Sequence, residues 1–247
     1  MPKILKRILL VLLALVLLAF IALGVYLCTP TKAQDTANQA VNSEGVWSND
    51  GVQVVNREEQ IAFIPQNPKA GLIFYPGIKI ESKTYAPLLR NLAERGILCV
   101  APTIPFNVSV FNVNAADGIQ EQYPQVNTWY MAGHSLGGVS AAHYVANHPN
   151  QYKGLILIGA FLNADLSNTN LRLLQVDASY DQVKPMNKYL DMSDKSPADT
   201  TTVVVEGGNH SQFGDYRKYD ADGDASISPE QQWTQTADFI ANWVFKS

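Results

Sequence analysis

The chain is poor in charge and almost devoid of cysteine. Of its 247 residues, 16% are charged and two are cysteines, Cys28 and Cys99. Two cysteines cannot form the disulfide network that holds many small secreted domains together, so we expect a packed hydrophobic core instead. The composition can supply such a core, since 47% of the residues are hydrophobic.

Positive charge is scarce outside the N-terminal segment. Residues 1–33 carry four basic side chains, Lys3, Lys6, Arg7 and Lys32, and no acidic one. The remainder therefore has 18 − 4 = 14 basic and 22 acidic residues, a net charge of −8, against −4 for the whole chain. Because nucleic-acid affinity depends on Lys and Arg that contact phosphates, no nucleic acid is expected as a partner. The acidic remainder favours neutral or cationic substrates over polyanions.

Charge is absent altogether from residues 8–28, an apolar run of 21 residues. As a helix rising about 1.5 Å per residue, this run would span about 31 Å, which matches the hydrocarbon core of a bilayer. The basic residues before it predict a cytoplasmic N-terminus and an extracytoplasmic remainder. A signal peptide cleaved near residues 31–33 also fits, but the apolar regions of such peptides usually have about 7–15 residues. We therefore favour a membrane anchor over residues 1–33, with secretion after cleavage as the alternative.

The rest of the chain divides into a polar segment and one domain. Residues 34–52 are rich in Asn, Gln, Asp, Ser and Thr without periodicity, which is typical of a linker. Over residues 53–247, apolar runs alternate with amphipathic stretches. This alternation predicts an α/β fold, with a mostly parallel, doubly wound sheet and helices on both faces. The expected strands are residues 53–56, 60–64, 71–75, 97–101, 129–132, 154–159, 171–176 and 201–206, and the expected helices are 85–95, 136–147 and 231–245.

A nucleophile motif lies between an expected strand and an expected helix. Residues 133–138 read Gly-His-Ser-Leu-Gly-Gly, which contains the pattern Gly-x-Ser-x-Gly. In this context Ser135 would sit on a tight turn that projects its hydroxyl from the sheet edge, and the glycines would leave room for the neighbouring backbone. The backbone N–H of Leu136, at the start of the helix, would face a developing oxyanion.

Three further motifs accompany this turn. They are Phe74-Tyr75-Pro76-Gly77, Tyr85-Ala86-Pro87-Leu88 and Gly207-Gly208-Asn209-His210, the last leading to Phe213-Gly214-Asp215-Tyr216. With them, residues 53–247 resemble the α/β-hydrolase superfamily, and within it the small group without a lid domain that is related to dienelactone hydrolases. The resemblance implies a catalytic triad in the chain order Ser, Asp, His. A serine mechanism of this kind needs no cofactor, and the only metal candidate in the sequence is the weak calcium pattern described below.

Four histidines are candidates for the base of such a triad. His134 adjoins Ser135 and would point away from it, while His143 and His148 lie on or just past the following helix, where a packing or surface role fits better. His210 alone follows the last expected strand, in a glycine-rich loop at the edge where Ser135 emerges. We expect His210 to take the serine proton and return it to the leaving group.

Two aspartates, Asp177 and Asp181, follow the strand expected at residues 171–176. The acid of the family sits in a turn a few residues past that strand, commonly before Val and Pro, and the sequence Asp-Gln-Val-Lys-Pro that begins at Asp181 fits this description. We favour Asp181, which would orient His210, and expect Asp177 to cap the turn.

The resemblance also implies a second oxyanion donor, in the loop after the strand at residues 71–75. Many relatives have His-Gly there, whereas this chain has Pro76-Gly77-Ile78. The matching donor is the backbone N–H of Ile78, unless Pro76-Gly77 is only a turn. The 11 residues 160–170 leave no room for a lid, which predicts a shallow, open pocket. The apolar stretch 103–113 either walls the acyl site or packs as an ordinary loop.

An acidic turn after His210 imitates a calcium loop. Asp220, Asp222 and Asp224 alternate as in an EF-hand, but Ala225 replaces the required glycine and Gln231 replaces the final glutamate. Related hydrolases carry a similar turn, so we favour a solvated turn over a calcium site.

Together these features predict an extracytoplasmic serine hydrolase that cleaves small to medium carboxylic esters or thioesters through an acyl-enzyme. The expected partners are a small-molecule ester and, through the N-terminal segment, a membrane. Amide or peptide hydrolysis, acyl transfer and an inactive binding protein are the alternatives, because one fold hosts many reactions.

Overall fold

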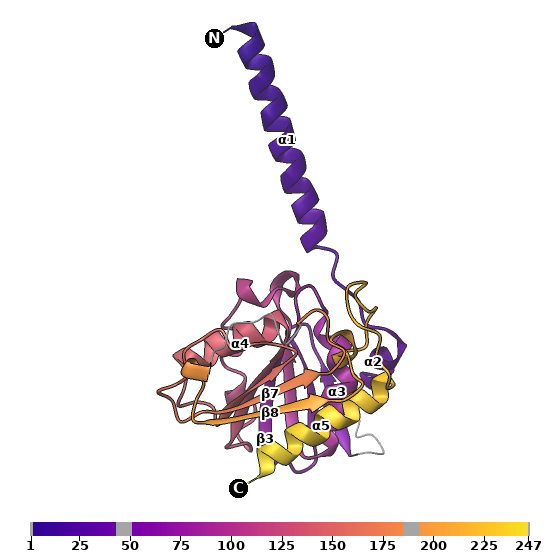
Figure 1. Ribbon diagram of the computed structural model, residues 1–247, viewed down its shortest axis with the longest axis vertical. Helices are drawn as coiled ribbons and strands as arrows, with labels where there is room; N and C mark the ends of the chain where they lie inside the picture. The colour runs from indigo at the N-terminus through magenta and orange to yellow at the C-terminus, as the bar shows by residue number, and fades with distance from the viewer. Residues whose placement is uncertain (1, 43–50, 185–192, 247) are drawn as a thin grey trace. The chain divides into compact units, whose positions relative to one another are not determined.

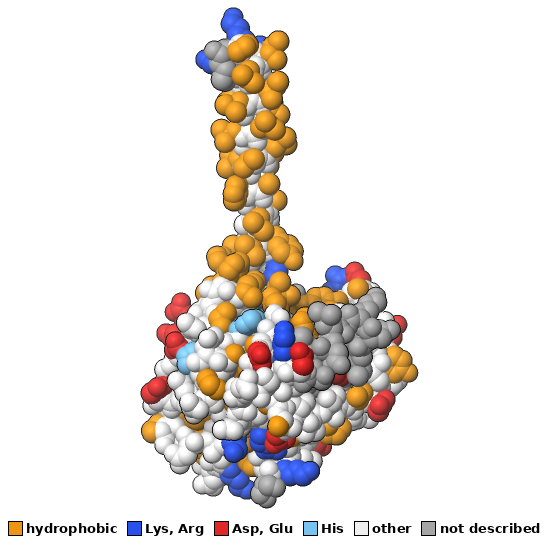
Figure 2. All heavy atoms as spheres, turned by 60° about the vertical axis from the view of Figure 1, so that its left-hand side comes forward, with side chains coloured by type: hydrophobic (Ala, Val, Ile, Leu, Met, Phe, Trp, Pro, Cys, Tyr) orange, Lys and Arg blue, Asp and Glu red, His pale blue; other side chains and the backbone are white. Residues whose placement is uncertain are grey.

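The computed structural model describes residues 2–42, 51–184 and 193–246, and the chain forms two compact units, residues 1–30 and 31–247. The first unit is one helix, α1 (Lys3–Leu27), with 25 residues, none of them buried, and its most apolar stretch of 18 residues has a mean hydropathy of 3.3. Figure 2 shows hydrophobic side chains along this helix and basic side chains at its start. By length and composition α1 can cross a bilayer, and a signal sequence would have the same properties.

The second unit is built on one sheet. Its strands are β1 (Val52–Asn56), β2 (Gln60–Pro65), β3 (Ala70–Tyr75), β4 (Ile97–Pro102), β5 (Trp129–His134), β6 (Gly154–Ile158), β7 (Arg172–Ala178) and β8 (Asp199–Val205). They lie in the order β1-β2-β4-β3-β5-β6-β7-β8, in which the pairs β1–β2 and β2–β4 are antiparallel and the other five pairs are parallel. The predicted mostly parallel sheet is therefore confirmed.

Helices cover both faces of this sheet. They are α2 (Asp35–Ala40), α3 (Ala86–Glu94), α4 (Leu136–Asn147) and α5 (Pro229–Phe245), with 3-10 turns at Ser82–Tyr85, Pro105–Asn107, Ser109–Phe111, Gln120–Gln122, Ser193–Lys195 and Ser211–Phe213. Alternate residues of a strand point to opposite faces. In β3, Leu72 and Phe74 accordingly join a core with α3 and α5, whereas Ile73 and Tyr75 join a second core with α4. Figure 1 shows this two-sided arrangement, which agrees with the doubly wound fold expected from the sequence.

The closing helix α5 begins two residues earlier than its apolar periodicity predicts. The Ser228 hydroxyl accepts the Gln231 N–H at 3.2 Å, and the Gln231 side chain accepts the Ser228 N–H at 3.0 Å. This reciprocal capping box satisfies two backbone donors that the helix itself cannot satisfy. Gln231, which stands where a calcium loop would have its final glutamate, thus helps to cap the start of a helix.

Residues 31–42 belong to the domain, which differs from the linker expected over residues 34–52. Thr31 forms a parallel bridge with Ile80, and Ala37 in α2 is fully buried. A helix of six residues is too short to show an apolar periodicity, so its polar composition resembled that of a linker. The part of the expected linker at residues 43–50 lies outside the described residues.

Asp215 helps to hold α2 on the domain. The Asp215 side chain accepts the Ala37 N–H at 2.7 Å, and the Gln34 N–H donates to the Asp215 carbonyl at 3.0 Å. Burial raises the pKa of Asp215, and the N–H donors at the start of α2 oppose that rise. The position of α2 therefore depends in part on Asp215, a residue from the other end of the chain.

We expect Asp215→Ala to loosen α2 without unfolding the sheet. Loss of the acceptor leaves a buried N–H unpaired, so the free energy of unfolding should fall by about 1–3 kcal/mol. Hydrogen exchange, followed by mass spectrometry, should rise over residues 35–40 and stay unchanged in β3. Asp215→Asn keeps one acceptor oxygen and should show a smaller effect. Unchanged exchange at residues 35–40 in Asp215→Ala would contradict this role for the carboxylate.

Candidate active site

Ser135 forms the junction between β5 and α4, in a strained turn. Its backbone has φ 53° and ψ −126°, a conformation that residues other than glycine rarely adopt. The Ser135 N–H donates to the Ile158 carbonyl at 3.0 Å, which ties the turn to the end of β6. The residue itself is half-buried. This turn therefore holds a partly accessible hydroxyl at the carboxyl end of β5.

Two glycines make the turn possible. A Cβ atom at Gly133 would collide with the backbone of Gly137 and Gly138, and a Cβ atom at Gly137 would collide with the carbonyl oxygens of Tyr75 and Pro76. The obstacles are backbone atoms, so no change of rotamer could relieve either collision. The sequence expectation that these glycines leave room for neighbouring backbone agrees with this packing.

His210 and Asp181 lie in contact, on the loops that follow β8 and β7. The His210 Nδ1 atom is 2.7 Å from the Asp181 Oδ2 atom, and the two side chains are 1% and 2% exposed. A carboxylate accepts only, so Nδ1 carries the ring proton and Nε2 is left as an acceptor. The Nε2 atom is buried and has no hydrogen-bond partner in the described part of the chain. The imidazole is thus arranged to accept a proton at Nε2.

The loop after β7 holds the Asp181 carboxylate in place. Its Oδ1 atom accepts the N–H groups of Val183 at 2.9 Å and Lys184 at 2.6 Å, which leaves Oδ2 for His210. The Lys184 ammonium in turn pairs with Asp177 at 2.6 Å, and both of these side chains are buried. Asp177, the alternative acid, lies within β7 and contacts Lys184, so it does not serve as the turn cap we expected.

Asp222 joins the loops that carry His210 and Asp181. One of its oxygens accepts both the N–H and the hydroxyl of Ser211 at 2.7 Å, and the other faces the Gln182 N–H at 3.3 Å. Ser211 follows His210 and Gln182 follows Asp181 in the chain. One buried carboxylate therefore ties both loops together beside the His210–Asp181 pair. Sequence reasoning missed this role, because the only signal was an acidic turn that resembles a calcium loop.

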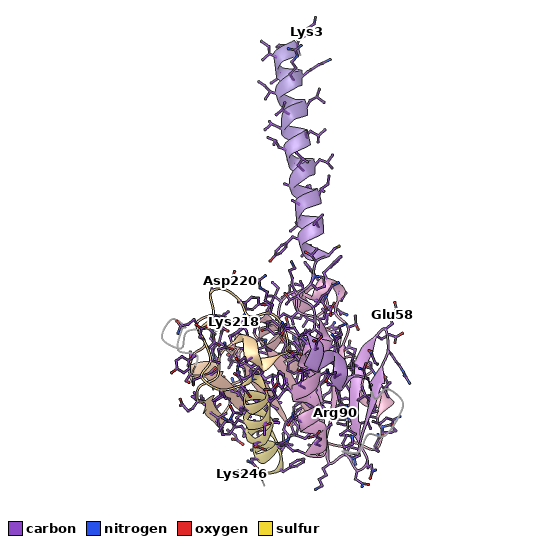
Figure 3. All side chains as sticks on the ribbon, turned by 90° about the vertical axis from the view of Figure 1, so that its right-hand side faces the viewer. Lys3, Glu58, Arg90, Lys218, Asp220 and Lys246 are labelled. Atoms are coloured by element: carbon purple, nitrogen blue, oxygen red, sulfur yellow. The ribbon has the colours of Figure 1, made fainter. Side chains whose placement is uncertain are left out.

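The other two aspartates of the acidic turn have different surroundings. Asp220 is 93% exposed beside Arg217, and Asp224 pairs with Lys218 at 2.7 Å. Figure 3 shows Lys218 and Asp220 together on the domain surface. The three carboxylates therefore do not converge, and within the described ranges no group of three or more His, Cys, Asp or Glu side chains could hold a metal. Asp222, at 6% exposure, also differs from the solvated turn that we favoured.

His134 lies in the core directly against His210. The two ring centroids are 4.4 Å apart, and the His134 Nδ1 atom is 2.8 Å from the Tyr85 hydroxyl. That hydroxyl also accepts the Gly77 N–H at 3.1 Å, so it links the ring of His134 to the loop after β3. Burial, and then the proximity of His210, lower the pKa of His134 well below its usual value. His134 is therefore a neutral packing partner of His210.

The remaining two histidines bind local groups beside α4. His143 Nε2 lies 3.3 Å from the Asn163 side chain, and His148 Nδ1 lies 2.8 Å from the Tyr144 carbonyl. The latter also stacks on the Tyr144 ring at a centroid distance of 4.3 Å. These contacts are those of surface and packing residues.

The loop after β3 forms a tight turn. The Ile80 N–H donates to the Gly77 carbonyl at 3.2 Å, and Lys79 has a positive φ of 58°. Ile78 is 42% exposed at the tip of this turn. Since Gly137 packs against the end of β3, the turn adjoins the start of α4, where Leu136 contributes the first N–H.

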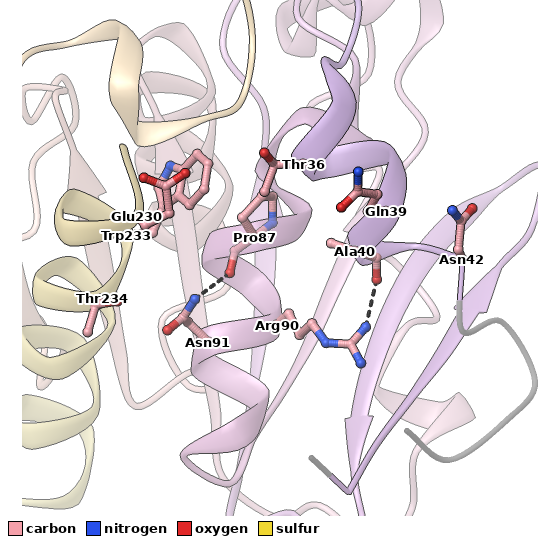
Figure 4. A pocket seen from close by; sticks show the side chains of 10 residues that line it. All are labelled: Thr36, Gln39, Ala40, Asn42, Pro87, Arg90, Asn91, Glu230, Trp233 and Thr234. Atoms are coloured by element: carbon pink, nitrogen blue, oxygen red, sulfur yellow. Dashed lines mark hydrogen bonds between the residues drawn. The ribbon is translucent and has the colours of Figure 1, made fainter. Parts of the chain in front are cut away.

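A separate groove of about 570 Å³ lies between α2, α3 and α5 (Figure 4). Two of its polar side chains are bonded locally, the Arg90 guanidinium to the Ala40 carbonyl at 2.7 Å and the Asn91 amide to the Pro87 carbonyl at 2.9 Å. Neither Ser135 nor His210 lines it. The groove thus forms where α2 packs beside α3 and α5.

The sequence pattern of the Alpha/beta hydrolase family matches residues 71–234, a span that includes Ser135, Asp181 and His210. The chain belongs to the alpha/beta hydrolase family. The superfamily inferred from the motifs is thereby confirmed, whereas the closer likeness to dienelactone hydrolases stays a prediction. No curated protein matches the chain.

Solved structures share this alpha/beta hydrolase fold at low sequence identity. The chain is similar to Est1E from Butyrivibrio proteoclasticus, in a structure with ferulic acid bound, at 15% identity over 81% of this chain and 99% of that one, with a TM-score of 0.58. It is also similar to TT1662 from Thermus thermophilus (17% identity, 79% and 99% covered, TM-score 0.56). A third similar structure is a predicted CIB-like hydrolase from Thermoplasma acidophilum (18% identity, 77% and 97% covered, TM-score 0.52). With the family match, these likenesses support hydrolase activity.

The buried neutral ring of His134 should make stability depend on pH. Its pKa in the folded state lies below the unfolded value of about 6.5, so at lower pH the unfolded state binds more protons. We expect the free energy of unfolding to fall below about pH 6.5, by up to about 1.4 kcal/mol per pH unit. Urea denaturation at a series of pH values measures this slope.

His134→Gln keeps an acceptor for Tyr85 and should flatten the dependence. His148→Gln, at a half-buried site, is the matched control and should keep the parental slope. The same slope in His134→Gln and the parent would show that another group is responsible.

Proposed function

We propose that this alpha/beta hydrolase is a serine hydrolase that cleaves small to medium carboxylic esters or thioesters through an acyl-enzyme. Ser135 attacks the acyl carbon, and His210 accepts its proton at Nε2 and later donates it to the leaving group. Asp181 keeps the ring proton on Nδ1 and stabilises the imidazolium. The proposal includes an extracytoplasmic domain that α1 anchors to the membrane.

The observation that carries this proposal is the buried 2.7 Å contact between His210 and Asp181 on the edge where the Ser135 turn ends β5. A structural histidine usually satisfies its ring nitrogens. His210 keeps an unpaired, buried Nε2, as His134 does, but the Nδ1 atom of His210 contacts a buried carboxylate whereas that of His134 contacts a tyrosine hydroxyl. A buried nitrogen without a hydrogen bond lowers the stability of the fold. A serine hydroxyl that donates its proton to this atom during acyl transfer would give it a partner.

The oxyanion would be held by two backbone N–H groups, those of Leu136 and Ile78. The Leu136 N–H opens α4, so the helix dipole adds to its attraction for negative charge. Ile78 belongs to the turn that packs next to this helix end. Backbone donors need no reorganisation when charge develops, which is why they suit this task.

Ser135→Ala should abolish ester hydrolysis and labelling by a fluorophosphonate probe, because the proposed nucleophile is removed while the fold stays intact. A panel of p-nitrophenyl esters, thioesters and anilides measures the activity and separates ester from amide preference. Ser167→Ala, in the loop between β6 and β7, is the matched control and should label and turn over as the parent does. If the probe does not label Ser135 in the parent protein, the serine mechanism is wrong, and a binding role becomes the better interpretation.

Asp222→Ala should lower kcat by about 100-fold with little change in KM, because a small displacement of the base from the nucleophile is costly. Fluorophosphonate labelling at Ser135 should slow in parallel. Asp220→Ala removes an exposed carboxylate of the same turn and should keep parental kcat. Parental kcat in Asp222→Ala, or loss of activity on addition of a calcium chelator, would contradict a positioning role for Asp222.

A further inference from the structure

Four large apolar side chains are exposed on two neighbouring loops at the carboxyl edge of the sheet. They are Ile78, Phe106, Val110 and Phe111, which are 42%, 49%, 51% and 57% exposed, and we call them the apolar rim. Single exposed apolar residues are normal on soluble domains, but a cluster of them marks a surface that binds something. The rim therefore needs a partner of apolar character.

Hydrogen bonds and ring contacts make the rim one surface. The Lys79 N–H donates to the Asn107 carbonyl at 2.6 Å, which joins the two loops, and the rings of Phe106 and Phe111 meet at 6.1 Å. The Ser109 hydroxyl contacts the Ser140 hydroxyl in α4 at 2.8 Å. The rim is thus fixed beside the start of α4, next to the Ser135 turn.

The loop that carries most of the rim has an unusual composition and backbone. Residues 96–116 contain no charged side chain, although residues 34–247 as a whole carry a net charge of −8. Phe106 and Asn107 both have a positive φ of 55°, which a bulky residue such as phenylalanine rarely adopts. Strain of this kind persists where the surrounding structure maintains it, often at functional surfaces. Here it accompanies an exposed phenylalanine.

The chain enters the domain at this same edge. The Thr31 N–H donates to the Lys79 carbonyl at 2.6 Å, and the Glu81 N–H donates to the Thr31 carbonyl at 3.1 Å. The apolar helix α1 ends at Leu27, so only residues 28–30 separate it from a residue that is fixed to the rim loop. At no more than about 3.6 Å per residue, this tether cannot exceed about 14 Å.

We propose that the apolar rim is a docking surface for the lipid bilayer that α1 crosses. The proposal rests on the membrane anchor included in the proposed function. A short tether keeps the rim close to the headgroup layer, where exposed phenylalanines partition favourably. Lys32 and Lys79, which flank the Thr31 bridge, add positive charge that anionic headgroups attract. The carboxyl edge of the sheet, where Ser135 lies, would then face the lipid surface.

The full-length protein in vesicles of phosphatidylcholine and phosphatidylglycerol tests this proposal. Single cysteines, in a Cys28→Ser background, carry a bimane label at Phe111→Cys or Val110→Cys on the rim, at Asn67→Cys on the opposite edge, or at Leu15→Cys within α1. Cys99 is fully buried and should not react. Vesicles that contain nitroxide lipids quench only labels that lie in or on the bilayer.

We expect both rim labels and the Leu15 label to lose most of their fluorescence, and the Asn67 label to keep it. A quenched Leu15 label with unquenched rim labels would overturn docking and leave the anchor intact. Unquenched labels at all positions would overturn docking and the anchor together. If the rim fluorescence changes with protein concentration but not with nitroxide lipid, a second copy of the chain covers the rim, and docking on the bilayer is overturned. Fluorophosphonate labelling of Ser135 in the same vesicles tests the catalytic proposal separately.

Discussion

The close approach of backbone to backbone at Ser135 is the constraint on which the site depends. Gly137 packs directly on the carbonyls of Tyr75 and Pro76, so the end of β3 and the start of α4 lie against each other. Any side chain at this point would push the two elements apart and separate the loop of Ile78 from the Leu136 N–H. The positive φ of Ser135 costs energy that must be offset elsewhere, and the bond from its N–H to Ile158 is one compensation.

Carboxylates position the other half of the site. Asp181, Asp177 and Asp222 are all buried, and each accepts hydrogen bonds from protein groups. Because a carboxylate only accepts hydrogen bonds, it fixes the orientation of the N–H and O–H groups around it. His134 contributes in the opposite way: its buried ring stays neutral, so it places no second positive charge against His210. In the proposed mechanism, an imidazolium formed at His210 would therefore face Asp181 and would not be repelled by a charge on His134.

Much of the fold follows from local patterns in the sequence. The strands β3 to β6 are buried on both faces, so they read as continuous apolar runs, and the turn at Ser135 follows from its glycines. The helix α2 could not be found in this way, because its place depends on Asp215, 178 residues away from Ala37. The role of Asp222 was hidden for the same reason. Alternating aspartates look alike in a calcium loop and in a clamp, and the difference lies in Ser211 and Gln182, which are 11 and 40 residues away.

The attachment of the N-terminal segment also follows from topology. In a doubly wound sheet the loops at the carboxyl ends of the strands carry the reactive groups, and the same loops are free to vary in composition. Thr31 pairs with one of these loops, so the chain leaves the domain beside the site rather than from the far edge. Only residues 28–30 lie between the end of α1 and Thr31, the residue that forms this bridge. Under the docking proposal, an apolar, uncharged loop is tolerated at the surface because it faces lipid rather than water.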